Sequence, residues 1–183
     1  MTAKTNSSPV PIVVVCGPKK SGKTTLVEQL LAALRARGYR VGTVKHSAHK
    51  HLVDKPGTDS YRHRRAGAAA TLFLTPEEAA FFTDAPEEPE LLFRRLFADV
   101  DLILVEGLSQ EPWPKVVLLP ENDTDYLFSL APETVAAVLT EVPADELHLA
   151  ADVGIFRPGE VTRLTSFLEE RFSLTAARRE NEV

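Results

Sequence analysis

Hydrophobic positions near the start of the chain follow first a strand pattern and then a helix pattern. Residues 11–17, PIVVVCG, form a continuous apolar and β-branched run that ends in glycine, which is typical of a strand buried on both faces. In residues 23–38, KTTLVEQLLAALRARG, apolar side chains recur at helical spacing, and Gly38 stands where a C-cap is expected. Residues 39–46, YRVGTVKH, have the pattern of a second short strand. Strand, glycine-rich turn, helix and strand form a βαβ unit, which predicts a parallel sheet with a right-handed crossover.

The rest of the chain continues to alternate between strand and helix patterns. Two apolar segments, AATLFLT and AAFFTD, are joined by PEE and predict a β-hairpin. A helix can start in TDSYRHRRAGA with Thr58 or Asp59 as its N-cap, and amphipathic helices are expected in EEPELLFRRLFADV and GEVTRLTSFLEERF. Three further strands are expected in DLILVEG, KVVLLP and VAAVLT. The alternation predicts an α/β fold: a mostly parallel sheet flanked by helices, with an inserted apolar β-hairpin.

The size of the chain is compatible with one compact unit. Its 183 residues, 44% of them hydrophobic, can bury one substantial core. We therefore expect a single domain over residues 10–173, with a flexible N-terminus at residues 1–9 and a flexible tail at residues 174–183.

Charge and cysteine content narrow the classes of partner. The 26 acidic and 21 basic residues give a formal net charge of −5, which argues against binding of nucleic acid or anionic membranes by bulk charge. A single cysteine, Cys16, excludes an intramolecular disulfide framework and fits a reducing compartment. The first apolar run is too short for a signal peptide, and no run approaches the roughly 20 apolar residues of a membrane span. We expect a cytoplasmic protein without nucleic-acid or membrane partners.

The turn between the first strand and the first helix carries the clearest chemistry. Residues 17–24, GPKKSGKT, satisfy the pattern G-x-x-x-x-G-K-[ST]. In such a loop the backbone N–H groups surround the β-phosphate, Lys23 reaches the β- and γ-phosphates, and the Thr24 hydroxyl ligates Mg²⁺. The strand before the loop and the helix after it are the context that the motif requires, so the sequence predicts a P-loop NTPase-like domain.

Two further segments are expected at the same edge of the sheet. Glu106 ends the strand DLILVEG and can hold the water shell of Mg²⁺. The stretch KHSAHKHLVDKPGTDSYRHRRAG follows the second strand and is expected to form a switch or lid, in which Lys45 and His46 stabilise phosphate charge. Asp54 or Asp59 could add an oxygen ligand for Mg²⁺. A solvated loop is the alternative, and a transition-metal site at the histidines of residues 46–51 is opposed by the positive charge of the lysine at position 50.

Three segments resemble a known family in their order and spacing: GPKKSGKTTL, VKHSAHKHLVDKPGTDSYRHRRAGA, and DLILVEGL followed by PKVVL. The family is that of the MobB-type GTP-binding adapter proteins of molybdopterin guanine dinucleotide biosynthesis. The second segment, K-H…D-x-x-G-x-D-S-x-R, is more specific than the P-loop. The resemblance implies a P-loop fold, a homodimer, and GTP binding with weak hydrolysis at best. It also implies partnership with the molybdenum cofactor guanylyltransferase, the nucleotidyltransferase that attaches GMP to molybdopterin, and leaves direct binding of molybdopterin open.

The resemblance also assigns individual residues. It assigns to the nucleotide Gly17, Lys19, Ser21, Gly22, Lys23, Thr24 and Thr25, and it assigns Thr24 and Glu106 to Mg²⁺. The place of the basic stretch at the same sheet edge adds Lys45, His46 and Asp59 as candidate nucleotide ligands and Asp54 as a candidate Mg²⁺ ligand. The sequence has Ala48, His49 and Lys50 where the family tends to have His-His-Asp, so a metal or acid–base role does not carry over to that triplet.

The residues alone leave the reaction open. No N-K-x-D follows VAAVLT, so a preference for GTP over ATP rests on the resemblance. Arg64 and Arg65 can supply charge for phosphoryl transfer, but no general base is evident. Besides an adapter, the sequence is compatible with an ATP-dependent small-molecule kinase and, from its histidines, with a metal-delivery GTPase.

Overall fold

The computed structural model describes residues 9–47, 53–86, 88–121 and 123–175. The predicted flexible ends, 1–9 and 174–183, lie almost entirely outside these residues. Contacts group the chain into two compact units, Met1–His46 with Leu96–Val183, and Ser47–Arg95. The expectation of one domain over residues 10–173 stays a prediction.

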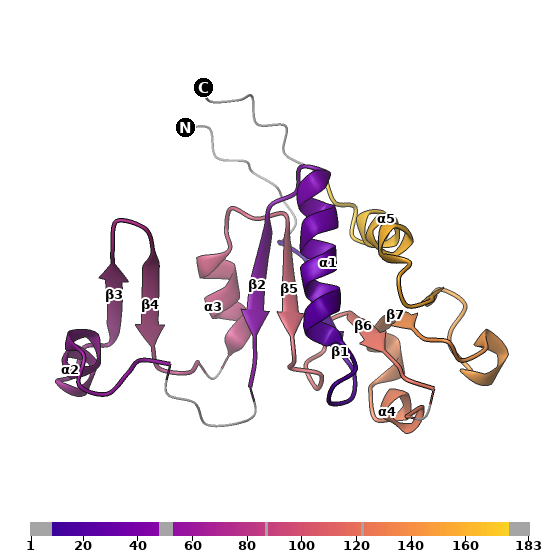
Figure 1. The fold of residues 1–183 in the computed structure, drawn as a ribbon, viewed down its shortest axis with the longest axis horizontal. Coiled ribbons are helices and arrows are strands. Elements are labelled where there is room, and N and C mark those ends of the chain that lie inside the picture. The colour runs from indigo at the N-terminus through magenta and orange to yellow at the C-terminus, as the bar shows by residue number, and fades with distance from the viewer. Residues whose placement is uncertain (1–8, 48–52, 87, 122, 176–183) are drawn as a thin grey trace. The chain divides into compact units, whose positions relative to one another are not determined.

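The first unit is built on a six-stranded parallel sheet (Figure 1). Its strands are β1 (Ile12–Cys16), β2 (Val41–Lys45), β5 (Leu102–Glu106), β6 (Lys115–Leu118), β7 (Val135–Leu139) and β8 (Gly154–Phe156). They are ordered β2-β5-β1-β6-β7-β8, and all paired neighbours are parallel, which confirms the predicted α/β architecture. The sequence does not indicate β8, because three residues that include a glycine are too short for a strand pattern.

Two helices pack against each other over one face of this sheet. They are α1 (Lys23–Ala36) and α5 (Val161–Arg171). Leu30 and Leu34 of α1 and Leu164 and Leu168 of α5 are fully buried in one core with the strand side chains of that face. Gly38 follows α1 with φ 86°, as the sequence predicts for its C-terminal end. The short helix α4 (Asp125–Phe128) and two 3₁₀ turns (Pro132–Thr134 and Ala144–Glu146) lie between later strands.

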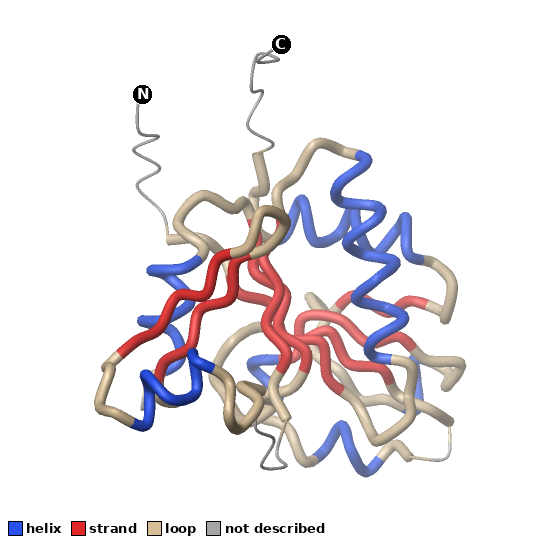
Figure 2. The backbone as a smooth tube through the Cα atoms, turned by 60° about the vertical axis from the view of Figure 1, so that its left-hand side comes forward, coloured by secondary structure: helices blue, strands red, loops and turns tan. Residues whose placement is uncertain are grey.

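The second unit contains the predicted hairpin and two helices. The helix α2 (Asp59–Arg65) begins after Thr58, whose hydroxyl accepts a hydrogen bond from the Tyr61 N–H, so the predicted cap is Thr58. The strands β3 (Ala70–Leu74) and β4 (Ala79–Thr83) pair antiparallel, which confirms the hairpin. Figure 2 shows α2 beside this hairpin, in agreement with the contacts between α2 and β3. The helix α3 (Pro89–Leu96) follows, and all of it except its last residue, Leu96, belongs to this unit.

Across the described ranges, no helix is both long enough and apolar enough to cross a membrane.

Candidate nucleotide-binding site

The loop between β1 and α1 is shaped by two glycines. A Cβ on Gly17 would lie 2.4 Å from the Leu118 carbonyl oxygen, so only glycine fits this close approach. Gly22 has a left-handed backbone at the N-cap of α1, where no side chain of the described residues caps the helix. The first backbone N–H groups of α1 are therefore left for a ligand, and the helix dipole makes this end attractive to anions.

Lys23 and Ser21 present the polar groups of the loop. The Lys23 amine donates hydrogen bonds to the carbonyl oxygens of Gly17 at 3.1 Å and Pro18 at 2.6 Å. Ser21 Oγ is buried and has no hydrogen-bond partner among the described residues. Such a buried hydroxyl costs free energy unless a partner arrives. Lys19 and Thr25, the other predicted ligands of this loop, are exposed.

Glu106 joins the loop to the ends of two strands. It is the last residue of β5, and its side chain is only 9% exposed. The Thr24 hydroxyl donates to Glu106 Oε1 at 2.9 Å, and Lys45, at the end of β2, forms an ion pair with the same oxygen. The structure thus brings Glu106 together with Thr24, which lies 82 positions before it in the chain, and with Lys45, which lies 61 positions before it.

The environment of Glu106 favours its ionised form. Burial works against ionisation, but hydrogen bonds from Lys45 and Thr24 and the positive charges of Lys45 and Lys23 outweigh it. The pKa of Glu106 therefore lies below its ordinary value. A carboxylate held next to a hydroxyl offers the hard oxygen donors that Mg²⁺ prefers, so these residues fit the predicted ion.

His46 lies beside the turn that follows Glu106. Its backbone N–H donates to the Glu106 carbonyl oxygen at 2.9 Å. Gly107 has φ 104°, and a Cβ there would lie 3.1 Å from the His46 Cβ. Glycine at position 107 thus permits both the turn and the close approach of His46.

The predicted ligands of the second unit are engaged within that unit. Asp54 Oδ1 accepts hydrogen bonds from Thr58 at 3.2 Å and Ser60 at 2.9 Å, and Arg64 lies 3.6 Å from Oδ2. At that distance Arg64 forms an ion pair without a hydrogen bond, so the buried Oδ2 lacks a hydrogen-bond partner in the described part of the chain. Asp59 is exposed and pairs with Arg62 at 3.5 Å.

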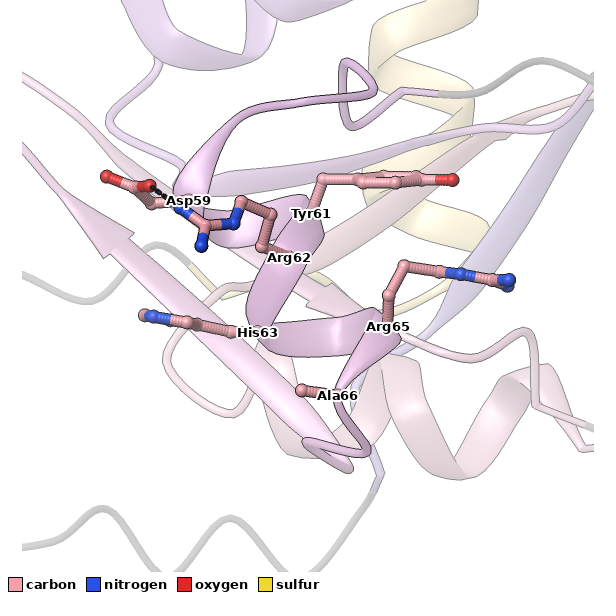
Figure 3. Close-up of a pocket in the computed structure, with 6 residues that line it drawn as sticks. All are labelled: Asp59, Tyr61, Arg62, His63, Arg65 and Ala66. Carbon is pink, nitrogen blue, oxygen red and sulfur yellow. Dashed lines mark hydrogen bonds and ion pairs between the residues drawn. The ribbon is translucent and has the colours of Figure 1, made fainter.

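A shallow surface pocket is lined by residues of α2 and by Ala66, which caps its C-terminal end (Figure 3). Asp59, Arg62 and His63 project to one side of the helix, and Tyr61 and Arg65 project to the other. Three basic side chains therefore surround α2, which agrees with the basic character predicted for this stretch.

Comparison with known proteins assigns the chain to a protein family. The sequence model of the MobB family, described as molybdopterin guanine dinucleotide synthesis protein B, matches residues 12–141. The chain belongs to the MobB family. The matched range contains the phosphate loop, Glu106 and the whole second unit.

Relatives in the MobB family cover most of the chain. The chain is 37% identical over 167 residues to a molybdopterin-guanine dinucleotide biosynthesis adapter protein of Escherichia coli (strain K12), with 88% of this chain and 93% of the relative covered. The protein of the same name from Haemophilus influenzae is 35% identical, with 87% and 88% covered. Among solved structures, a MobB protein homolog from Bacillus stearothermophilus is 30% identical with a TM-score of 0.62, and the match covers 88% of this chain and 97% of that one.

The histidines of the loop remain only partly placed. His46 is described, whereas His49, His51 and the departures from the MobB pattern at Ala48 and Lys50 lie outside the described residues.

Sequence reasoning missed three residues that surround the phosphate loop. Lys115 is buried at the start of β6, although its segment PKVVL belongs to the resemblance. Burial raises the pKa of the Tyr126 hydroxyl on α4, and Cys16, Ser109 and Gly17 also influence that pKa. Neither Tyr126 nor Ser109 lies in a recognisable motif, so no sequence signal identifies them.

Proposed function

We propose that this chain is a GTP-loaded adapter in molybdopterin guanine dinucleotide biosynthesis. In this proposal it binds GTP with Mg²⁺ and assists the molybdenum cofactor guanylyltransferase that attaches GMP to molybdopterin. Membership of the MobB family and the names of the relatives support the pathway. The observation that carries the nucleotide site is the 2.9 Å contact between Thr24 of the phosphate loop and Glu106.

The predicted ligands have distinct roles in this proposal. The N–H groups at the start of α1 bind the phosphates, and the Lys23 amine exchanges the carbonyl oxygens of Gly17 and Pro18 for phosphate oxygens. Thr24 and Glu106 hold Mg²⁺, which neutralises charge between the β- and γ-phosphates when it is bound. The further nucleotide ligands of the proposal are Lys19, Ser21, Thr25, Lys45, His46 and Asp59. Its third Mg²⁺ ligand is Asp54, whose Oδ2 has no hydrogen-bond partner among the described residues.

Glu106 suits the role of a metal ligand in this proposal. Its lowered pKa keeps the carboxylate ionised, which is the form that binds Mg²⁺. Weak hydrolysis at best is the part of the proposal that follows from the family resemblance.

The proposal has three further parts: a homodimer, a cytoplasmic location and direct contact with molybdopterin. Exposed apolar side chains on the hairpin support a homodimer. A cytoplasmic location and direct contact with molybdopterin stay predictions.

Titration calorimetry with GTP and, separately, ATP in the presence of Mg²⁺ tests the proposal. We expect GTP to bind more tightly than ATP, and Lys23→Ala to raise the Kd for GTP more than about tenfold, because charge-assisted contacts to phosphate are lost. Lys20→Ala is the matched control, since Lys20 is exposed in the same loop outside the phosphate-contacting positions of the motif. Equal or tighter binding of ATP would contradict the GTP assignment and favour the kinase hypothesis.

The same variants test the adapter role. In a reconstituted assay with the guanylyltransferase, this chain should stimulate GMP attachment, and Lys23→Ala should lose that stimulation. Stimulation by Lys23→Ala equal to that of the wild-type chain would contradict a nucleotide-dependent adapter.

A further inference from the structure

Lys115 is a buried lysine that has no part in the proposed set of ligands. It stands at the start of β6 and is only 1% exposed. Its amine donates hydrogen bonds to the carbonyl oxygens of Glu111 at 2.6 Å and Trp113 at 3.0 Å. A buried amine is costly unless it is hydrogen-bonded, so these two bonds strongly favour one path of the chain. Lys115 thereby holds residues 107–114, which connect Glu106 to β6.

The first part of this segment is a tight turn directly after Glu106. Gly107 and Leu108 have φ values of 104° and 53°, so two successive residues adopt a left-handed backbone. This backbone is uncommon for leucine and costs free energy, so surrounding contacts must hold it. The Glu111 N–H supplies one such contact by donating to the Leu108 carbonyl oxygen at 3.2 Å. The turn is therefore held by the same residue whose carbonyl oxygen accepts from Lys115.

A continuous path of hydrogen bonds thus leads from Lys115 to the turn after Glu106. It runs from the Lys115 amine to the Glu111 backbone, and from there to the Leu108 carbonyl oxygen. Pairing of β5 with β1 and β2 fixes the backbone up to Glu106, and the bonds from Lys115 fix the backbone that leaves it. A metal ligand binds best when the groups behind it fix its orientation.

We propose that Lys115 is a positioning residue, which holds the turn after Glu106 so that the Glu106 carboxylate and the Thr24 hydroxyl are oriented for Mg²⁺. This inference rests on the proposed function for the ion and the nucleotide. It assigns a role that neither the phosphate-loop motif nor the family match gives to Lys115. Because backbone carbonyl oxygens engage its amine, Lys115 acts on the ion through the turn and not by contact.

The Mg²⁺ dependence of GTP binding tests this role. Calorimetry measures the Kd for GTP in Mg²⁺ and, separately, in EDTA. Lys115→Met keeps an unbranched side chain and removes the amine, and its Kd in Mg²⁺ should rise about tenfold, as for other groups that orient a metal ligand. Its Kd in EDTA should stay within about twofold of the wild-type value, because the phosphate loop keeps its own contacts. A merely structural role would raise both values alike and would refute the proposal.

A double variant shows whether Lys115 acts through Glu106. In a Glu106→Gln background the charged ligand is already lost, so adding Lys115→Met should change the Kd in Mg²⁺ by less than about twofold. A further rise of about tenfold in that background would mean that Lys115 acts on GTP independently of Glu106, which contradicts the proposal.

The single tryptophan of the chain reports the segment itself. Trp113 is 8% exposed, and its carbonyl oxygen accepts from Lys115. Acrylamide should quench its fluorescence more strongly in Lys115→Met than in the wild-type chain, because the segment is no longer held. Unchanged quenching would contradict the path through residues 107–114.

Two further variants separate positioning from a general loss of stability. Thr165→Val is the matched control, because Thr165 is also fully buried and donates to a backbone carbonyl oxygen, that of Val161 at 2.7 Å within α5. It should keep both wild-type Kd values. Lys115→Gln leaves a shorter, neutral donor and should reproduce the Mg²⁺-specific rise in Kd, even where Lys115→Met fails to fold.

The outcomes distinguish this inference from the proposed function. If Mg²⁺ tightens GTP binding to the same extent in the wild-type chain and in both Lys115 variants, the positioning role is refuted and the nucleotide site stands. If the wild-type chain binds GTP equally well in Mg²⁺ and in EDTA, the Mg²⁺ site of the proposed function fails. The inference then fails with it.

Discussion

At the residue scale, Glu106 links the stability of the fold to the chemistry of the site. Its carboxylate is buried at the end of β5 and is kept ionised by Thr24, Lys45 and Lys23. A group whose pKa is lower in the folded chain than in the unfolded chain stabilises the fold above the unfolded-state pKa. That stabilisation is lost as the pH falls through the folded-state pKa.

We therefore expect Glu106→Gln to lower the free energy of unfolding near neutral pH. The difference from the wild-type chain should shrink as the pH falls below the ordinary glutamate pKa of about 4.3. Lys45→Met should shift the acid loss of stability to higher pH, because it removes both the hydrogen bond and the positive charge by which Lys45 lowers the pKa of Glu106. Urea unfolding at a series of pH values, without nucleotide, measures both effects.

A second carboxylate provides the control for Glu106. The pKa of Glu160 is also lowered, by a hydrogen bond from the Arg157 N–H and by Arg163. Glu160 stands at the start of α5, however, and is not one of the candidate nucleotide or Mg²⁺ ligands. Glu160→Gln should leave the Kd for GTP unchanged, whereas Glu106→Gln should weaken binding in the presence of Mg²⁺. A pH-independent stability difference for Glu106→Gln would show that its pKa is not lowered.

At the element scale, α2 depends on a polar cluster more than on an apolar face. None of its side chains is buried, and Asp54, just before it, is 4% exposed and accepts from Thr58 and Ser60. The Arg64 guanidinium lies next to Asp54 and 5.7 Å from the centre of the Phe82 ring of β4. Arg64 thus connects the helix both to the turn before it and to the hairpin after it.

Removing Arg64 should therefore destabilise the second unit. Arg64→Ala leaves the Asp54 carboxylate buried without its counter-charge, and we expect a loss of about 1–3 kcal/mol. Arg62→Ala is the matched control on the same helix, since its ion pair with Asp59 is exposed on both sides and should contribute less than about 1 kcal/mol. Hydrogen exchange of the α2 and β3 amides reports the local stability. Equal protection in the two variants would contradict the anchoring role of Arg64.

The apolar pattern of the sequence predicts most of the helices and strands. The long α1 has a clear apolar period of helical spacing, and the buried strands β1, β5 and β7 are continuous apolar runs. The hairpin has two apolar runs around a short polar turn. The three-residue β8 has too few positions for a period to emerge. Asp54 was predicted only as a candidate metal ligand, and its ties to Thr58, Ser60 and Arg64 depend on side-chain geometry that no spacing rule encodes.

At the scale of the whole molecule, the nucleotide site depends on topology. The ends of β1, β2 and β5 meet because these strands are parallel neighbours, which allows Lys45 to reach Glu106. The βαβ pattern and the acidic strand end were enough to predict this convergence. The hydrogen bonds of Lys115 to the carbonyl oxygens of Glu111 and Trp113 could not be predicted, because they hold a loop whose path is set by packing.

The hairpin leaves an apolar surface that a second copy of the chain would explain. Leu72, Leu74 and Phe81 lie on one face of β3 and β4 and are 58%, 66% and 47% exposed. In the described residues these two strands pair only with each other, and an isolated two-stranded hairpin is marginally stable in water. Burial of this face in the proposed homodimer would remove its large side chains from water.

A charge on this face should separate the proposed dimer. We expect Leu72→Glu with Phe81→Glu to shift the mass measured by light scattering from dimer to monomer, because burying two carboxylates is costly. Phe128→Glu, at an exposed phenylalanine of the first unit, should remain dimeric. A double variant that stays dimeric would place the interface elsewhere. Because the phosphate loop, Lys45 and Glu106 all belong to the first unit, a monomeric variant that still binds GTP would show that nucleotide binding does not require the dimer.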